Sequence, residues 1–133
     1  MELLAVHRLD YHKGHVLECC SNMLNVEWPR SEVLRMRSLQ SSCDDFPTCL
    51  ALVVRGTSAD DSSPPPEVLG HVRMTRIPTV PKGVWIESVI LHPDLRGRGV
   101  GKYLMLRAEE YAKSKGFTEA YLNTIDKQIF YSR

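Results

Sequence analysis

Residues Leu91–Lys102 read LHPDLRGRGVGK, and this segment is the most informative part of the sequence. An apolar stretch precedes it and a helical pattern follows it, so the segment joins a buried strand to the start of a helix. Its three glycines let backbone N–H groups approach an anion and point at it. A helix start adds free N–H donors and a partial positive charge. The sequence therefore predicts a loop that binds phosphate.

Three cations, Arg96, Arg98 and Lys102, stand at this helix start. Acidic side chains are favoured there, and violations of such local rules concentrate at functional sites. A bound polyanion would resolve the conflict, whereas the alternative is a capping loop with incidental arginines. Two common phosphate motifs do not fit. A Walker A lysine is followed by Ser or Thr, but Lys102 is followed by Tyr103, and the glycines are spaced G-x-G-x-G instead of G-x-G-x-x-G.

The rest of the chain alternates between strand and helix patterns. We expect strands at 2–9, 48–55, 68–77, 84–92 and 119–124, and helices at 11–24, 31–40, 100–115 and from 125 onward. In the second helix, three-residue spacing predicts that Val33, Met36 and Leu39 face inward. The proline-rich stretch at 56–67 predicts a flexible loop. We expect residues 1–133 to form a single domain.

Composition narrows the class of protein. The net charge of +1 gives no global field that would favour nucleic acid or a membrane, and no apolar run is long enough to span a bilayer. The 4 cysteines form no C-x-x-C pair, and the 5 histidines show no metal-ligand spacing. We therefore expect free thiols, no metal, no secretory signal and a cytoplasmic location.

The loop also carries a family signature. Arg96, Gly99 and Gly101 occupy the defining positions of the pattern Q/R-x-x-G-x-G/A, and the order of elements agrees nearly end to end. The chain thus resembles the GNAT superfamily of acetyltransferases. The resemblance implies an α/β fold with a mixed, mostly antiparallel sheet flanked by helices. Because the last two strands of that fold do not follow in the sequence, we expect a chain that is truncated at its C-terminus.

The same resemblance implies acetyl-CoA as the acetyl donor. Backbone groups at the end of the strand are expected to meet its acetyl and pantetheine portions, and the loop amides its pyrophosphate. The residues expected to contact the donor are Val89, Ile90, Leu91, Arg96, Gly97, Arg98, Gly99, Val100, Gly101 and Lys102.

Two side chains are candidates for proton transfer. By resemblance, Tyr131 faces the departing sulfur, with plain core packing as the alternative. Glu87 lies two residues before Val89, and strand alternation predicts that both face the same side. Glu87 is then placed to act as a base, directly or through water, and the alternative is a carboxylate paired with a neighbouring cation. Backbone N–H groups near Val89 are candidates for holding the oxyanion.

The acceptor is expected beside the first two helices. Arg30, Arg35 and Arg37 gather within eight residues, close to Trp28 and Ser38. Helical geometry puts Arg30 and Arg37 on one face, with Arg35 partly off it. A solvated basic face is one interpretation. In a nearly neutral protein, a local cluster of arginines also suits a carboxylate-rich peptide, which guanidinium groups bind bidentately.

This region is similar to the NatH-type N-terminal acetyltransferases, which modify processed actin. The similarity lies in Trp28–Ser31, Arg35–Leu39, Asp44–Leu50 and Gly70–Arg73. It implies a protein acceptor with an acidic N-terminus, such as actin, modified in the cytosol after translation. Acceptor-binding residues are expected to be Trp28, Arg30, Arg35, Met36, Arg37, Ser38, Asn123 and Thr124. The alternatives are acetylation of lysines or small amines, a non-catalytic acyl-CoA-binding module, and a scaffold for an acidic protein surface.

Overall fold

The computed structural model describes residues 1–54, 62 and 64–122. Along the chain the elements are β1 (Glu2–Ala5), η1 (Val6–Arg8), α1 (Lys13–Glu27), α2 (Glu32–Gln40), β2 (Thr48–Val54), β3 (Glu67–Arg76), β4 (Gly83–Leu91), η2 (Pro93–Leu95), α3 (Val100–Ser114) and β5 (Glu119–Leu122). The predicted order of strands and helices is confirmed up to β5. The helix expected from residue 125 lies outside the described residues. Within the described part, no helix is both long and apolar enough to cross a membrane.

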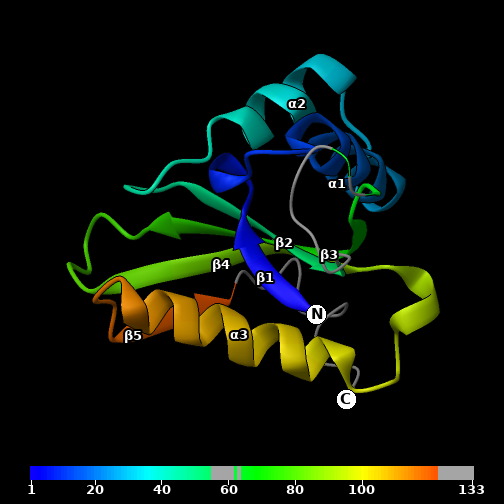
Figure 1. Ribbon diagram of the computed structural model, residues 1–133. Coiled ribbons are helices and arrows are strands. Elements are labelled where there is room, and N and C mark those ends of the chain that lie inside the picture. The colour runs from blue at the N-terminus through cyan, green and yellow to red at the C-terminus, as the bar shows by residue number, and fades with distance from the viewer. Residues whose placement is uncertain (55–61, 63, 123–133) are drawn as a thin grey trace.

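The described strands form one sheet in the order β1-β2-β3-β4-β5. The first four strands pair antiparallel with their neighbours, and β5 pairs parallel to β4. A parallel pair needs a crossover connection, which α3 supplies between β4 and β5. In Figure 1, α1 and α2 lie on one side of the sheet and α3 lies on the other. This is the mixed, helix-flanked sheet that the sequence predicted.

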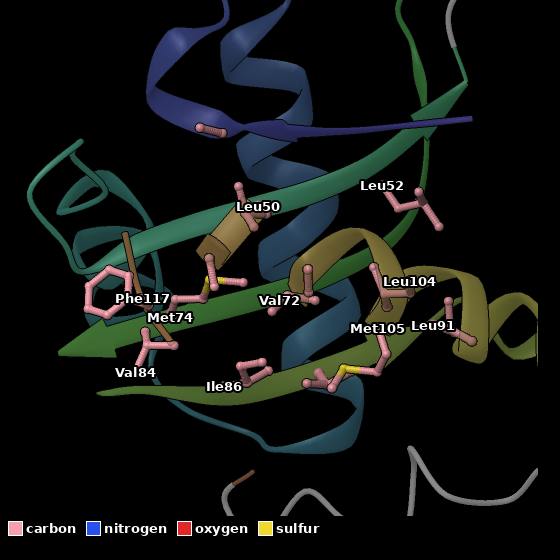
Figure 2. Close-up of a cluster of buried hydrophobic side chains, with 14 of the residues drawn as sticks. Leu50, Leu52, Val72, Met74, Val84, Ile86, Leu91, Leu104, Met105 and Phe117 are labelled. Carbon is pink, nitrogen blue, oxygen red and sulfur yellow. The ribbon is translucent and has the colours of Figure 1, made fainter. Parts of the chain in front are cut away.

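Alternating strand residues build a separate core on each side of the sheet. On the α3 side, Leu104 and Ala108 pack against strand residues such as Val72 and Met74, as Figure 2 shows for most of this cluster. On the α1 and α2 side, the buried strand residues include Ala51 and Ile90. Leu104 and Ala108 are four residues apart, so they lie on one face of α3.

Helix α2 departs from its predicted inward face. Ser31 caps its start, because the Ser31 hydroxyl accepts a hydrogen bond from the Leu34 amide at 3.1 Å. Leu39 is buried as predicted, but Val33 is 66% exposed. Residues six apart differ by about 120° around a helix of 3.6 residues per turn, so Val33 and Leu39 cannot share one narrow face. The prediction for Val33 was wrong, and Arg35 takes the buried position beside Leu39.

Candidate functional site

The loop after β4 presents backbone donors to solvent. Its turn depends on Gly97 and Gly99, whose φ angles of 80° and 78° lie in the left-handed region that favours glycine. Gly99 is the N-cap of α3, no side chain of the described residues is seen to cap this helix, and its first turn holds no acid. The first amides of any α-helix lack an intrahelical partner. These amides therefore point outward from a helix end with a partial positive charge.

The three cations predicted at this loop are exposed. Arg96 lies 3.7 Å from the Glu27 carboxylate at the end of α1, so it links the loop to the opposite side of the sheet. Exposed Arg98 and Lys102 flank the uncapped helix start. A cradle of amides and cations that leaves a helix uncapped fits a polyanionic group such as a pyrophosphate.

The three strand residues predicted to contact the donor have buried side chains. Val89 and Leu91 point into the α3-side core, and Ile90 points into the other. What they can offer a ligand is therefore their backbone, as the family resemblance implied. The described pairing of β4 with β5 extends only from Gly83–Glu119 to Ile86–Leu122.

A β-bulge interrupts β4 between the two halves of the site. On β3, His71 pairs with Ile90 and Arg73 pairs with Glu87, so β4 holds one residue more than β3 over this interval. Ser88 lies within the extra length and has a φ of 52°, a left-handed conformation that costs a non-glycine residue about 1–2 kcal/mol.

The bulge overturns one prediction about β4. Ile86 and Val89 both join the α3-side core, although they are three residues apart and strict alternation would place them on opposite faces. Glu87 therefore faces the α1 and α2 side, and Val89 faces the α3 side. The expectation that Glu87 and Val89 share a face was wrong, because it assumed a regular strand.

On the α1 and α2 side, an open groove of about 590 Å³ runs between α2 and the sheet. Its lining residues are Arg30, Leu34, Arg37, Ser38, Ser41, Arg73, Glu87 and Ser88. Four of them, Arg30, Arg37, Ser38 and Glu87, were predicted as site residues from the sequence, and the structure brings them together. Arg30 and Arg37, two of the three arginines of the predicted cluster, thus line the same groove as the bulged part of β4.

Arg73 is a groove residue that sequence reasoning did not assign. Its Nε lies 3.4 Å from Glu87 Oε1, and its Nη1 donates a hydrogen bond to the Ser38 hydroxyl. It therefore joins α2 to β3 and β4 across the floor of the groove. Strand alternation puts Arg73 on the same face as His71, two residues before it, but the sequence holds no signal that this face borders a groove.

Glu87 lies on the groove wall and is also paired with a cation. Both interpretations of this carboxylate thus describe part of its surroundings: it is half-buried, close to a guanidinium, and open to the space where an acceptor amine would enter. The geometry keeps the base and the ion-pair roles open.

Arg35 does not line the groove. It is only 6% exposed, its Nε donates to the Asn25 side-chain oxygen at 3.0 Å, and its Nη2 donates to the Trp28 carbonyl. Burial, and after it the nearby Arg30 cation, lowers the pKa of Arg35. Because its donors hold the link between α1 and α2, the prediction that Arg35 contacts an acceptor is corrected to a structural role.

The remaining predicted acceptor residues are divided. Trp28 and Met36 are partly buried and pack against the α1 and α2 core, and neither is among the groove-lining residues. Both side chains therefore pack in the core on this side of the sheet, and the geometry does not support direct contact with an acceptor. Asn123, Thr124 and Tyr131 lie outside the described residues, and their predicted roles stay predictions.

Comparison with known proteins assigns this chain to a family. Residues 17–131 match the model of the Acetyltransferase (GNAT) family, and the chain belongs to this family. It is also similar to mouse N-alpha-acetyltransferase 80, with 36% identity over 120 residues. That alignment covers 90% of this chain and 37% of the relative, so the chain spans little more than a third of its relative's length.

Solved structures agree on the fold. An aminoglycoside 6'-N-acetyltransferase in complex with coenzyme A superposes with a TM-score of 0.67 and 16% identity, covering 92% of this chain and 61% of that one. Tetrahymena GCN5 gives a TM-score of 0.66 and 10% identity, covering 98% and 76%. At these identities the likeness concerns the fold alone.

Proposed function

We propose that this protein is an N-terminal acetyltransferase that moves an acetyl group from acetyl-CoA to the α-amino group of an acidic protein N-terminus. The observation that carries the proposal is the groove lining, where the described residues include three arginines, Arg30, Arg37 and Arg73, and one carboxylate, Glu87. Similarity to an N-alpha-acetyltransferase supports the reaction, and the arginines support the charge of the acceptor.

The donor is assigned to the loop before α3. The amides of Val100, Gly101 and Lys102 at the uncapped helix start, with Arg96 and Arg98, would hold the pyrophosphate of acetyl-CoA. When bound, acetyl-CoA supplies an activated acetyl thioester. The buried segment Val89–Leu91 would orient the acetyl group through its backbone, because its side chains are occupied in the two cores.

The acceptor must present a neutral amine. An α-amino group with a pKa near 7.7–8.0 is roughly one-tenth neutral at pH 7. A lysine amine with a pKa near 10.4 is neutral in fewer than about one molecule in a thousand. An N-terminal amine therefore demands less of a base. Glu87 is the described carboxylate on the groove wall that can take up the proton, directly or through water.

The groove favours a carboxylate-rich terminus. Arg30 and Arg37 are exposed, so their guanidinium groups can form bidentate contacts with Asp or Glu side chains. Arg73 lines the same groove next to Glu87 and adds positive charge on the β3 side of the groove. Processed actin, whose N-terminus carries several acidic residues, is the acceptor we propose, and the cytosol is the place of reaction, in keeping with the four free cysteines.

A peptide-array acetylation assay tests the proposal by varying the first three residues of the acceptor. We expect acidic termini to be acetylated at least about tenfold faster than neutral or basic ones. An N-terminally blocked peptide with an internal lysine separates α-amine from lysine acetylation. Equal rates for acidic and basic termini would contradict the acceptor, and preferred lysine acetylation would replace it with a different amine.

Reversing the charge of Arg37 tests whether this groove residue contributes to the preference for acidic peptides. Arg37→Glu should lower kcat/KM on acidic peptides by about 10- to 100-fold, because it exchanges a charge-assisted contact for a repulsion. Lys113→Glu is the matched control, since it changes net charge equally on α3, on the other side of the sheet. Acetyl-CoA binding should be unchanged in both variants. Loss of acetyl-CoA binding in Arg37→Glu would place Arg37 in the donor site and contradict the assignment.

A further inference from the structure

His71 is a buried polar side chain that the proposed reaction does not use. It lies on β3, it is 1% exposed, and it faces the α1 and α2 side of the sheet, as its neighbour two residues on, Arg73, does. Its Nδ1 lies 2.8 Å from the backbone carbonyl oxygen of Ser88. A carbonyl can only accept, so Nδ1 carries the hydrogen and the neutral ring has its lone pair on Nε2.

The other ring nitrogen of His71 is buried and has no hydrogen-bond partner among the described residues. A buried polar atom without a partner costs free energy that an apolar side chain of similar size would avoid. The cost of burying a histidine here must be offset by another interaction. The structure shows one such interaction, the hydrogen bond from Nδ1–H to the Ser88 carbonyl.

That bond ends on the bulge of β4. A bulge locally disrupts the regular ladder of hydrogen bonds, and a side-chain donor that bonds to its backbone adds to the contacts that hold it in place. His71 provides this donor from the neighbouring strand, at the residue whose φ is 52°. The side chain thus supports a conformation that Ser88 alone disfavours.

The bulge places the two sides of the site relative to each other. It turns Glu87 and Ser88 toward the groove and sends Val89 to the opposite face. We propose that His71 is a positioning residue for acetyl transfer, which pins the β4 bulge through Ser88 and so sets the acceptor groove against the donor segment Val89–Leu91. This inference rests on the acetyl transfer proposed above.

Two substitutions of His71 separate positioning from mere core packing. His71→Asn keeps a side-chain N–H near the place of Nδ1, whereas His71→Leu removes the donor and stays apolar. We expect kcat of His71→Leu to fall by about 10- to 100-fold, the loss that a displacement of about 1 Å can cause, while both KM values change little. His71→Asn should stay within about threefold of the wild type.

Val68→Ala controls for loss of stability. Val68 is a buried β3 residue of the same core, so its truncation lowers the melting temperature without touching the bulge. Its kcat should equal that of the wild type below the melting transition. Amide hydrogen exchange gives a second readout: the Val89 amide should exchange faster in His71→Leu and not in Val68→Ala.

The outcomes are distinct from those of the proposed function. Wild-type kcat in His71→Leu, or equal losses in His71→Asn and His71→Leu, would overturn the positioning role. If the wild type acetylates only non-acidic amines, the proposal of an acidic acceptor is wrong. The two His71 variants are then compared on the amine that is acetylated. A wild-type protein that acetylates no amine would overturn both.

Discussion

Lowering the pH should destabilise this protein through one buried side chain, His71. Burial chiefly lowers its pKa to about 4 from the ordinary value of 6.5; the bond to Ser88 opposes this, and the Arg73 and Arg35 cations add to it. Protonation would place an N–H on Nε2, which has no partner among the described residues. The folded protein therefore keeps His71 neutral at a pH where the unfolded chain is already protonated.

The direction and size of the effect follow by linkage. Above pH 6.5, both states hold His71 neutral, so the full stability is present. As the pH falls from 6.5 toward about 4, His71 becomes protonated in the unfolded state but stays neutral in the folded state, so the free energy of unfolding decreases. Over the whole interval the loss is about 3 kcal/mol, a large part of the stability of a small domain.

Urea unfolding followed by circular dichroism, at intervals from pH 7 to pH 4, measures this loss. His71→Asn is the reference, because it keeps the donor to Ser88 and has no titrating group at that position. Other titrating groups act alike in both proteins, so the difference in unfolding free energy isolates His71. We expect the wild type to lose about 3 kcal/mol more than His71→Asn. A difference between the two proteins that does not change with pH would show that His71 does not titrate differently in the folded and unfolded states.

Three further predictions concern the core, the backbone and the two kinds of arginine. Leu104→Ala should destabilise the protein by about 3 kcal/mol in urea unfolding, because Leu104 is fully buried against the sheet. Gly70→Ala should lower the free energy of unfolding by about 1–3 kcal/mol, because the new Cβ would lie 2.9 Å from the carbonyl oxygen of Ile90. Gly14→Ala should raise it by about 0.5 kcal/mol, because a Cβ at this position of α1 meets nothing within 4 Å. Equal effects of the two substitutions in calorimetry would contradict this prediction. Arg35→Met should lower stability by about 1–3 kcal/mol, and Arg37→Met should change stability little but lower acetylation of acidic peptides; the reverse pattern would contradict the assigned roles.

The order of elements and the glycine-rich turn before α3 could be predicted because they depend on local patterns. Apolar runs and helical spacing mark β4 and α3, and a glycine-rich connection between such elements has few structural solutions. The groove arginines Arg30 and Arg37 were found because they lie close together in the sequence, but the expected shared helical face was wrong, since Arg30 precedes the Ser31 cap of α2. These features need no knowledge of contacts between distant residues.

The features that sequence reasoning missed depend on tertiary pairing. No residue type at Ser88 announces a bulge, so strict alternation misplaced Glu87 relative to Val89. Arg35 was assigned by its charge, although Asn25 and the Trp28 carbonyl satisfy its guanidinium in a buried position. Arg73 and His71 gain their roles only when β3 lies beside β4. Each of these outcomes is decided by a partner that is distant in the sequence.

The ratio of kcat/KM for two acceptor peptides measures whether the groove recognises an acidic N-terminus. The peptides are identical except that one begins with three Asp residues and the other with three Asn residues, which have nearly the same shape without the charge. If Arg30, Arg37 and Arg73 recognise an acidic terminus, partly exposed charge pairs contribute about 1.5–3 kcal/mol in total. We then expect a ratio of about 10 to 100 that falls as salt is added. A ratio near one, unaffected by salt, would contradict the account.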